Sequence, residues 1–250
     1  YEWRNYFLWL YGGAGSVMSS AARKLMSASG GAGGGGAIAV VHSSFPYVTA
    51  YSWDGDTGFG GKFTNPSTLP TGTAKNVAFS LDVSAYPWSG SGFGTKFSNP
   101  ATLPTADGYG VAFSPDGAAI AIAHDASPRI TAYPWSGSGF GTKYSNPATL
   151  PSSVGFDVAF SPDGSAIAIA DISTPSVSAY PWSGSGFGTK FSSPATSTGT
   201  GYGVDFSPDG SAIAVAHVTS PYVSVYPWSG SGFGTKFANP ATLPTGSSIG

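Results

Sequence analysis

The sequence is poor in the residue types that carry thiol chemistry and charge. It contains no cysteine, which excludes disulfide bonds, thiol catalysis and thiolate metal sites. Charged residues make up 9% of the chain, against about 25% in a typical soluble domain. Glutamate, a good helix former, occurs only at Glu2. These absences argue against a helical protein.

Basic residues are few and scattered, and the formal net charge is −2. Nucleic-acid binding depends largely on clustered lysine and arginine that neutralise phosphates, so we expect no nucleic-acid partner. The longest early apolar run, residues 6–11 (YFLWLY), is too short to span a membrane and lacks the flanks of a signal peptide. We therefore expect no membrane span.

Glycine (37 residues) and proline (20) are abundant instead, which is typical of short strands joined by turns. The chain is also repetitive: the segment YPWSGSGFGTK occurs four times, and a diverged copy, YSWDGDTGFGGK, precedes these four. The tryptophans of the five copies are 35, 47, 47 and 46 residues apart. A period of this length predicts stacked supersecondary units.

One full unit contains four candidate strands, at residues 110–114, 118–124, 129–135 and 140–145, separated by an SPDG turn, a Ser-Pro entry and an SGSG turn. Four strands in about 45 residues is the period of a β-propeller blade. The second strand also alternates large and small residues, which suits blades packed face to face. The sequence thus predicts an all-β fold of about five propeller-type blades.

The repeat defines the expected domains. Residues 1–36 form a non-repeat segment, with a short helix over 16–28 capped by Ser16 and a glycine-rich linker over 30–36. A docking anchor, a disordered tail and a neighbouring-domain remnant are the alternatives for this segment. Residues 37–250 form the propeller repeats, with blades over approximately 37–75, 76–109, 110–154, 155–201 and 202–250.

The second blade is shortened. Residues 77–88 (VAFSLDVSAYPW) lack thirteen residues that lie between the same ends in 111–135. Either residues 76–88 form one long strand, which we favour slightly, or Leu81 and Asp82 link a hairpin. The first blade also starts at its second strand, and neither terminus supplies its inner strand. We therefore expect an incomplete or open ring.

The motif VAFSPDG, followed by an apolar strand and a third strand with an aromatic tip, resembles WD40 and YVTN-like propeller repeats over residues 37–250. The Gly-His start and Trp-Asp ending of WD40 repeats are missing, so their buried network is not carried over. The string AYPWSGSGFGTKYSNPATLP is similar to repeat arrays in tailed-bacteriophage proteins. That resemblance implies a virion or extracellular setting and no specific activity.

Polar residues at repeated positions are the first candidate sites. Asp116, Asp163 and Asp209 lie in the SPDG turns, where Asp and Gly satisfy the turn geometry. His42, His124 and His217 end the second strand, and Asp171 replaces His in the fourth blade, which suggests a partly wet, tolerant position. No spacing brings several metal ligands together, so we expect no metal site.

The loops give weaker signals. Asp54-Gly55-Asp56 is similar to the start of a calcium loop, but Asn65 stands where the required Glu would be. The SGSGFG loops are not followed by a helix or by Lys-Ser/Thr, which argues against a phosphate cradle. No Gly-x-Ser-x-Gly nucleophile elbow is present. We expect no cofactor.

The aromatic residues that recur once per blade are the candidate ligand-binding set. Exposed rings could stack on sugars and gain strength by multivalency, whereas buried rings would wedge between blades, which is the commoner role of large aromatics. The set comprises Trp53, Trp88, Trp135, Trp182, Trp228, Phe140, Phe187 and Phe233, with Phe59 and Phe93 at equivalent positions.

Taken together, the repeats favour a non-enzymatic scaffold, because an active site has to gather unlike residues and this chain repeats like ones. We expect protein partners or self-assembly, with cell-surface glycan as a further partner. The first alternative is a glycan-binding adhesin that uses the aromatics. The second is a propeller hydrolase or lactonase, for which one glutamate and three histidines supply little material.

Overall fold

The fold is all-β, as the sequence predicts. The computed structural model describes residues 25–28, 36–41, 45–46, 48–54, 58–69, 74–76, 78–79, 84–89, 92–195 and 199–246. These residues form antiparallel sheets and contain no helix. None of them could therefore cross a membrane as a long apolar helix.

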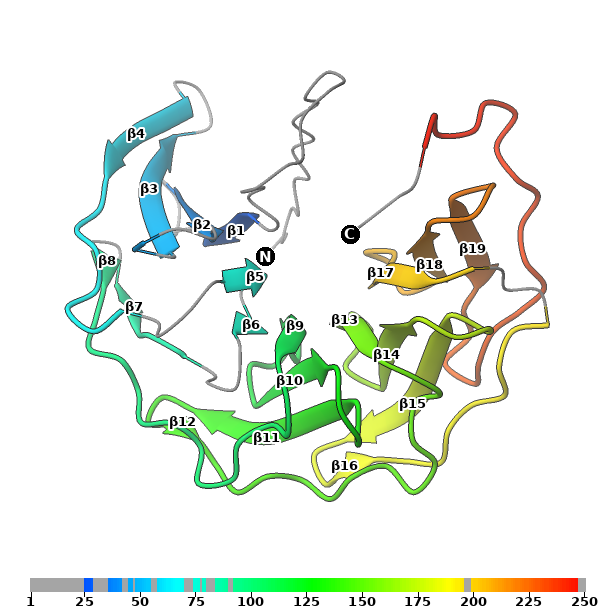
Figure 1. The fold of residues 1–250 in the computed structure, drawn as a ribbon, viewed down its shortest axis with the longest axis horizontal. Helices are drawn as coiled ribbons and strands as arrows, with labels where there is room; N and C mark the ends of the chain where they lie inside the picture. Colours follow the sequence, from blue (N-terminus) through cyan, green and yellow to red (C-terminus); the bar gives the residue numbers. More distant parts are fainter. Residues whose placement is uncertain are drawn as a thin grey trace. The chain divides into compact units, whose positions relative to one another are not determined.

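The strands follow the repeat, and the fourth strands of the two four-stranded sheets that contain β9 and β13 are only two residues long (Figure 1). Their bounds are β1 Leu25–Ala28, β2 Gly36–Val41, β3 Val48–Asp54, β4 Gly58–Lys62, β5 Ala74–Asn76, β6 Ala78–Phe79, β7 Trp88–Ser89, β8 Gly92–Phe93, β9 Gly108–Phe113, β10 Ala119–His124, β11 Ile130–Ser136, β12 Gly139–Phe140, β13 Gly155–Phe160, β14 Ala166–Asp171, β15 Val177–Ser183, β16 Gly186–Phe187, β17 Gly201–Phe206, β18 Ala212–His217 and β19 Val223–Pro227.

The chain divides into two compact units. Unit 1 comprises residues 1–79 and 84–97, and unit 2 comprises residues 80–83 and 98–250. Unit 1 contains the four-stranded sheet β1-β2-β3-β4 and two small sheets, β5-β6 and β7-β8. Unit 2 contains two four-stranded sheets, β9 to β12 and β13 to β16, and the three-stranded sheet β17-β18-β19.

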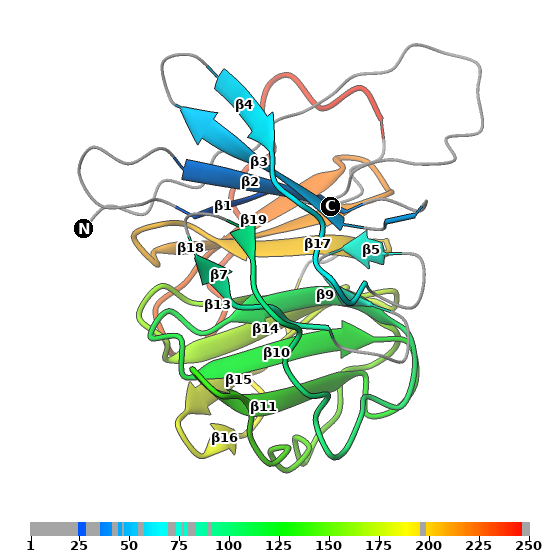
Figure 2. The same ribbon diagram turned by 90° about the vertical axis from the view of Figure 1, so that its left-hand side faces the viewer.

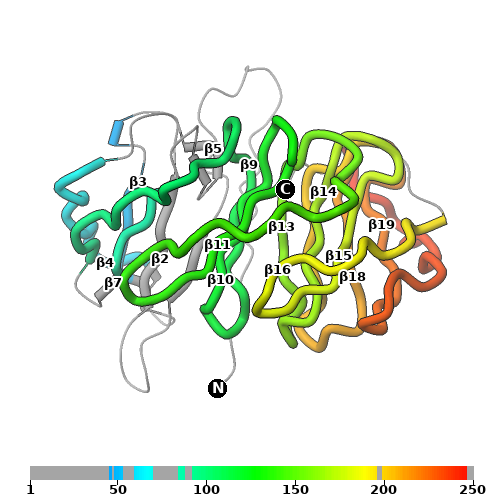
Figure 3. The backbone as a smooth tube through the Cα atoms, turned by 90° about the horizontal axis from the view of Figure 1, so that it is seen from below, coloured from blue at the N-terminus to red at the C-terminus, as the bar shows by residue number. Residues whose placement is uncertain are grey.

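Within unit 2 the three sheets follow one another in chain order and pack face to face (Figures 2 and 3). Their first strands approach one another, so that β9 lies beside β13 and β13 beside β17. The sheets repeat one register: Ile122 pairs with Val111 and Thr131, and Ile169 pairs with Val158 and Ser178. Each sheet of unit 2 is thus a propeller-type blade.

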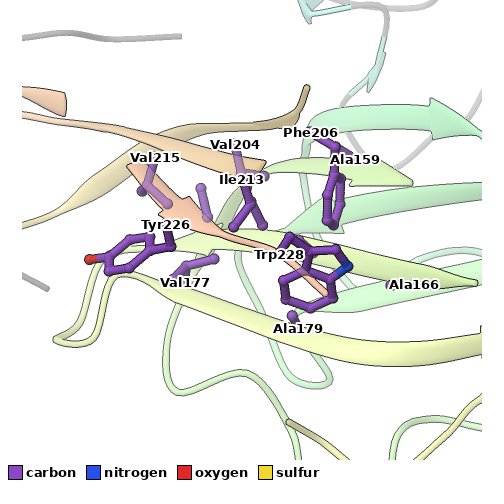
Figure 4. Packing of buried hydrophobic residues seen from close by; sticks show 12 residues of the cluster. Ala159, Ala166, Val177, Ala179, Val204, Phe206, Ile213, Val215, Tyr226 and Trp228 are labelled. Carbon is purple, nitrogen blue, oxygen red and sulfur yellow. The ribbon is translucent and has the colours of Figure 1, made fainter. Parts of the chain in front are cut away.

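Large side chains of one blade pack on small side chains of the blade before it. The alanines of β10 lie in one core cluster with Ile167 and Ile169 of the next blade. The alanines of β14 lie likewise in one cluster with Ile213 and Val215. Figure 4 shows this cluster, with Ala166, Ile213 and Val215 labelled. All four of these large side chains are at most 2% exposed. The alternation read from the sequence therefore fills the space between blades without any buried charge pair.

The predicted helix over 16–28 is wrong at its end. Residues 25–28 form β1, which pairs antiparallel with β2 from Leu25↔Val40 to Ala28↔Ala37. Residues 16–24 lie outside the described residues, as does most of the predicted linker over 30–36, although Gly36 begins β2. The non-repeat segment thus supplies the inner strand that the first blade was expected to lack.

The long strand favoured for 76–88 is not formed. Residues 74–76 and 78–79 pair with each other as β5 and β6, and residues 84–87 belong to no strand. The hairpin through Leu81 and Asp82 falls outside the described residues. A blade that has lost its second strand keeps only fragments of the repeat pattern, because its first strand has no neighbour with which to pair over its full length.

Candidate active site

Each blade of unit 2 presents two ends with different chemistry. We call the end where β9, β13 and β17 begin the entry end, and the end with the SPDG and SGSG turns the turn end. The loop from β10 to β11 lies at the entry end, because antiparallel strands reverse at alternate ends. The Asp125 amide at the start of this loop donates to the Asp107 carbonyl just before β9, over 3.3 Å. The pairs Ile172–Val154 and Val218–Thr200 make the same bond in the other two blades.

Blade three departs from the repeat at its entry end. Four polar or charged side chains gather there, which we call the charged cluster: Asp107, Tyr109, Asp125 and Arg129. Blade four has Val154, Phe156, Ile172 and Ser176 at the equivalent positions. Blade five has Thr200, Tyr202, Val218 and Tyr222. The cluster is therefore a departure from the repeat at the entry end of blade three, and Asp157 and Asp205 are separate departures on β13 and β17.

Hydrogen bonds and charge link the members of the charged cluster. Arg129 Nη1 donates to the Asp125 carbonyl oxygen over 2.5 Å. The Tyr109 hydroxyl interacts with the Asp125 carboxylate. Burial raises the pKa of Tyr109, and the negative charges of Asp125 and Asp107 raise it further. Asp125 is exposed and the other three side chains are half-buried, so both solvent and a ligand can reach the cluster.

The backbone holds the loop over 125–129 in place. Arg129 has a positive φ of 73°, which is unusual for a residue other than glycine, and its amide donates to the Ala126 carbonyl over 2.7 Å. Thr105 Oγ1 donates to the Ser127 carbonyl over 2.7 Å. Gly155 allows β13 to pass close by, because a Cβ there would lie 2.8 Å from the Arg129 carbonyl oxygen. Local geometry thus fixes the base of the Arg129 side chain.

Below the cluster lies a buried polar pair that recurs in each blade of unit 2. His124 Nε2 lies 3.0 Å from Thr131 Oγ1, and His217 Nε2 lies 3.0 Å from Ser224 Oγ. The equivalent carboxylate of blade four accepts a hydrogen bond from Ser178 Oγ over 3.1 Å. His124 is fully buried, and desolvation lowers its pKa to about 4. The expectation of a partly wet position is wrong here; His42 lies outside the described residues.

A row of aromatic rings extends from the cluster across the inner strands. Tyr109, Phe156 and Tyr202 are the second residues of β9, β13 and β17. The ring centroids of Tyr109 and Phe156 are 5.1 Å apart, and those of Phe156 and Tyr202 are 4.6 Å apart in a stacked arrangement. All three side chains are half-buried. We call these residues the aromatic row.

At the turn end the repeated aspartates serve their own turns, as the turn interpretation predicted. Asp116 Oδ1 accepts hydrogen bonds from Ser114 Oγ over 2.5 Å and from the Ala118 amide over 3.0 Å. Asp163 and Asp209 make the same two bonds, and the serine hydroxyl is the main cause that lowers the pKa of each aspartate, for Asp209 to about 2. Such strongly acidic carboxylates are poor general bases.

Two cavities also open at the turn end, each between successive blades. One, of about 490 Å³, is lined by Asp163, Asp209 and Trp228 among others. The other, of about 320 Å³, is lined by the equivalent residues Asp116, Asp163 and Trp182. Because these cavities repeat with the blades, they gather no unlike groups of the kind that an active site needs.

The candidate aromatics of unit 2 pack between and within blades. Trp182 is 8% exposed, and its ring meets Tyr144 of the preceding blade at 5.2 Å and Phe187 at 5.0 Å. Trp228 is 6% exposed and meets Phe233 at 5.2 Å. Trp135 is half-buried and meets Phe140 at 4.9 Å. Little ring face remains for a ligand on the first two tryptophans, and the side chains of Trp53 and Trp88 lie outside the described residues.

The metal candidates find no support in the part of the chain that the structure describes. No three or more His, Asp or Glu side chains come together there in a way that could hold a metal ion. The calcium-like segment lies largely outside that part, since residues 55–57 are not described. The described SGSG loops join one strand to the next and are not followed by a helix.

Sequence reasoning missed the charged cluster. Asp107, Asp125 and Arg129 belong to no motif, and they lie up to 22 residues apart along the chain. The sequence does mark these three positions. Blade three has charged residues there, whereas blades four and five have uncharged residues at the equivalent positions. The residues that the repeats share predict the blades. The charged cluster could be predicted only from the positions at which the repeats differ.

The comparisons with known proteins match the fold and not the sequence. No family model matches the chain, and no curated protein matches it. Among solved structures, a protein from Lactobacillus plantarum shares 14% identity at a TM-score of 0.60, over 84% of this chain and 70% of that one. A "putative 6-phosphogluconolactonase" from Bacteroides fragilis shares 11% identity at a TM-score of 0.61, over 84% and 68%. One of the same description from Bacteroides uniformis shares 14% at a TM-score of 0.52, over 78% and 64%.

These likenesses correct two expectations from the sequence. The chain was expected to be a non-enzymatic scaffold and not an enzyme, with a lactonase as the least favoured alternative. Two of the structures with a similar fold are named as putative 6-phosphogluconolactonases. This contradicts the expectation that a scaffold is favoured over a lactonase. At 11–14% identity the likeness itself shows a shared fold, and this fold is the propeller type that the repeats predicted.

Proposed function

We propose that this chain is a propeller hydrolase that opens a lactone ring at the charged cluster of blade three. The observation that carries the proposal is the local break in the repeat, where Asp107, Asp125 and Arg129 replace uncharged residues at the entry end. Charged groups at half-buried positions, as Asp107 and Arg129 are, cost free energy unless they are paired or hydrogen-bonded. The fold neighbours named as lactonases supply the reaction class.

The residues of the cluster fit the two needs of ester hydrolysis. A carboxylate accepts a proton from a water molecule while the oxygen of that water attacks the lactone carbonyl. We assign this role to Asp125, which is exposed and lies beside Tyr109. The Arg129 guanidinium stabilises the negative charge that develops on the carbonyl oxygen. The ring C–O bond then breaks, the alkoxide takes the proton back, and a hydroxy acid leaves. Asp107 supplies a second negative charge beside Tyr109.

The first experiment measures acid release from a panel of lactones in a pH-stat assay. The panel contains gluconolactone, its phosphorylated form, δ-valerolactone and a δ-lactone with a long alkyl chain. We expect hydrolysis by the full chain, with kcat lowered by about a hundredfold to ten-thousandfold in Asp125→Asn, since general-base catalysis contributes that much. We expect a loss of about a hundredfold or more in Arg129→Ser, because an oxyanion donor is removed.

The repeat provides matched controls. Asp125→Ile and Arg129→Ser install the residues that blade four already carries at Ile172 and Ser176, so these variants should fold. Ala118→Ser installs the blade-four residue Ser165 at the turn end and should keep full activity. If no lactone in the panel is hydrolysed, or if Asp125→Asn and Asp125→Ile hydrolyse as fast as the unchanged chain, the proposal is wrong.

For the setting of this activity we propose a phage virion or the extracellular space. The resemblance of the string AYPWSGSGFGTKYSNPATLP to repeat arrays in tailed-bacteriophage proteins supports this assignment. Mass spectrometry of purified particles and of culture medium tests it. Detection only inside cells would contradict it.

A further inference from the structure

We infer that the substrate is an uncharged lactone with an apolar substituent, and that the aromatic row formed by Tyr109, Phe156 and Tyr202 binds this substituent. The inference rests on the proposed function and departs from the phosphorylated sugar lactone in the names of the fold neighbours. Two independent observations carry it: the balance of charge in the cluster and the continuity of the row with the cluster.

The charged cluster is ill suited to a phosphate group. It holds two carboxylates, Asp107 and Asp125, against one guanidinium. Arg129 is the sole arginine among the described residues. A phosphate dianion is held by cations, preferably by the paired donors of a free arginine. The two carboxylates beside the single guanidinium repel a phosphate dianion.

Next to the cluster, the three inner strands present aromatic rings. Tyr109 belongs to both groups, because its hydroxyl interacts with Asp125 while its ring contacts Phe156. The ring of Tyr202 stacks on that of Phe156 at an interplanar angle of 30°, so the row continues across three blades. Each ring is half-buried and therefore keeps some apolar surface accessible. A lactone whose ring lies at Arg129 can place an alkyl or aryl group along this surface.

The contrast with the turn-end aromatics supports this choice of site. Trp182 and Trp228 are 8% and 6% exposed and are enclosed by neighbouring rings. The row instead combines partial exposure with direct contact to ionisable groups. Aromatic rings of this kind bind apolar groups by burying their surface from water.

The test separates substituent binding from chemistry. We compare KM and kcat for the alkyl-substituted δ-lactone and for δ-valerolactone, which has the same ring without the chain, in Phe156→Ala and Tyr202→Ala. We expect KM for the alkyl lactone to rise about tenfold to a hundredfold, as for a lost apolar contact, with kcat nearly unchanged. KM for δ-valerolactone should hardly change. Phe156→Tyr keeps an aromatic ring at this position, as Tyr109 does in blade three. Its KM for the alkyl lactone should therefore equal that of the unchanged chain.

Calorimetric titration with the matching alkyl δ-lactam, which resists hydrolysis, gives a readout that does not need catalysis. The lactam should bind the unchanged chain and Asp125→Asn, and bind Phe156→Ala more weakly by the same factor. Hydrolysis with a preference for phosphorylated gluconolactone, or equal KM in all row variants, would overturn this inference and leave the proposed function intact. Absence of all lactone hydrolysis would overturn the proposed function and this inference together.

Discussion

His124 and its equivalents show how one buried position accepts opposite charge types. In blades three and five a histidine nitrogen lies 3.0 Å from a hydroxyl on the third strand, and in blade four Asp171 accepts a bond from such a hydroxyl. Burial acts on each in the direction that favours the neutral form: it lowers the pKa of His124 and His217 and raises that of Asp171.

This makes stability dependent on pH with a defined sign. The pKa of His124 is about 4 in the folded chain and about 6.5 when unfolded, so the unfolded chain binds more protons between these values. The contribution of His124 to the free energy of unfolding is fully present above pH 6.5, and about 3 kcal/mol of it is lost as the pH drops to 4. Urea unfolding across this range, with NMR titration of the histidine, measures the change.

His124→Gln, which cannot be protonated there, is the control and should flatten this dependence. His217 acts in the same direction as His124, whereas the raised pKa of Asp171 acts oppositely. A His124 resonance that titrates near its ordinary pKa would show that water reaches the side chain and would contradict the buried position described above.

At the scale of elements, the SPDG turns join the first two strands of every blade in unit 2. Each depends on a serine–aspartate hydrogen bond and on a glycine with positive φ, at Gly117, Gly164 and Gly210. An L-residue pays a steric cost in that region of φ. The backbone geometry of the turn therefore requires these residue types, and this is why the SPDG motif alone identifies the turn in the sequence.

Gly164→Ala should lower the free energy of unfolding by about 1 kcal/mol, because φ is +71° there. The matched control is Gly184→Ala, where φ is not positive and an added Cβ meets nothing within 4 Å. Thermal unfolding of the two variants measures the difference. Equal melting temperatures would mean that the turn relaxes without cost.

The entry-end loops show the limit of such local reasoning. Arg129, Ser176 and Tyr222 share a positive φ although none is glycine, and each follows a cis proline. Nothing in these three residue types marks them as related. The Ser-Pro or Thr-Pro before each residue aligns the three positions in the sequence, but only the structure shows that they share this backbone conformation.

At the scale of the whole molecule, the least expected feature is β1. Residues 25–28 complete the first sheet of unit 1 by pairing with β2, although they lie outside the repeat. Their sequence, LMSA, carries no strand alternation as marked as that of AIAIAH in β10. The partner strand determined their conformation, since an unpaired sheet edge leaves backbone hydrogen bonds unmade.

Deletion of residues 1–28 should therefore destabilise the first sheet and leave unit 2 intact. We expect faster hydrogen exchange in peptides that cover β2, by about tenfold or more, because its edge loses a strand. Peptides that cover β10 serve as the internal control and should exchange at the original rate. Unchanged exchange in β2 would show that β1 adds no stability.

The sequence by itself determined the all-β class, the four-stranded blade and the packing of large on small faces. Strand alternation and turn residues are local properties, and each copy of the repeat shows them again. Only the tertiary structure decided which departures from that repeat meet in space. Asp107 and Arg129 are separated by a full hairpin, and Tyr109, Phe156 and Tyr202 by whole blades. Such contacts depend on strand register and on the stacking of sheets, which no single segment specifies.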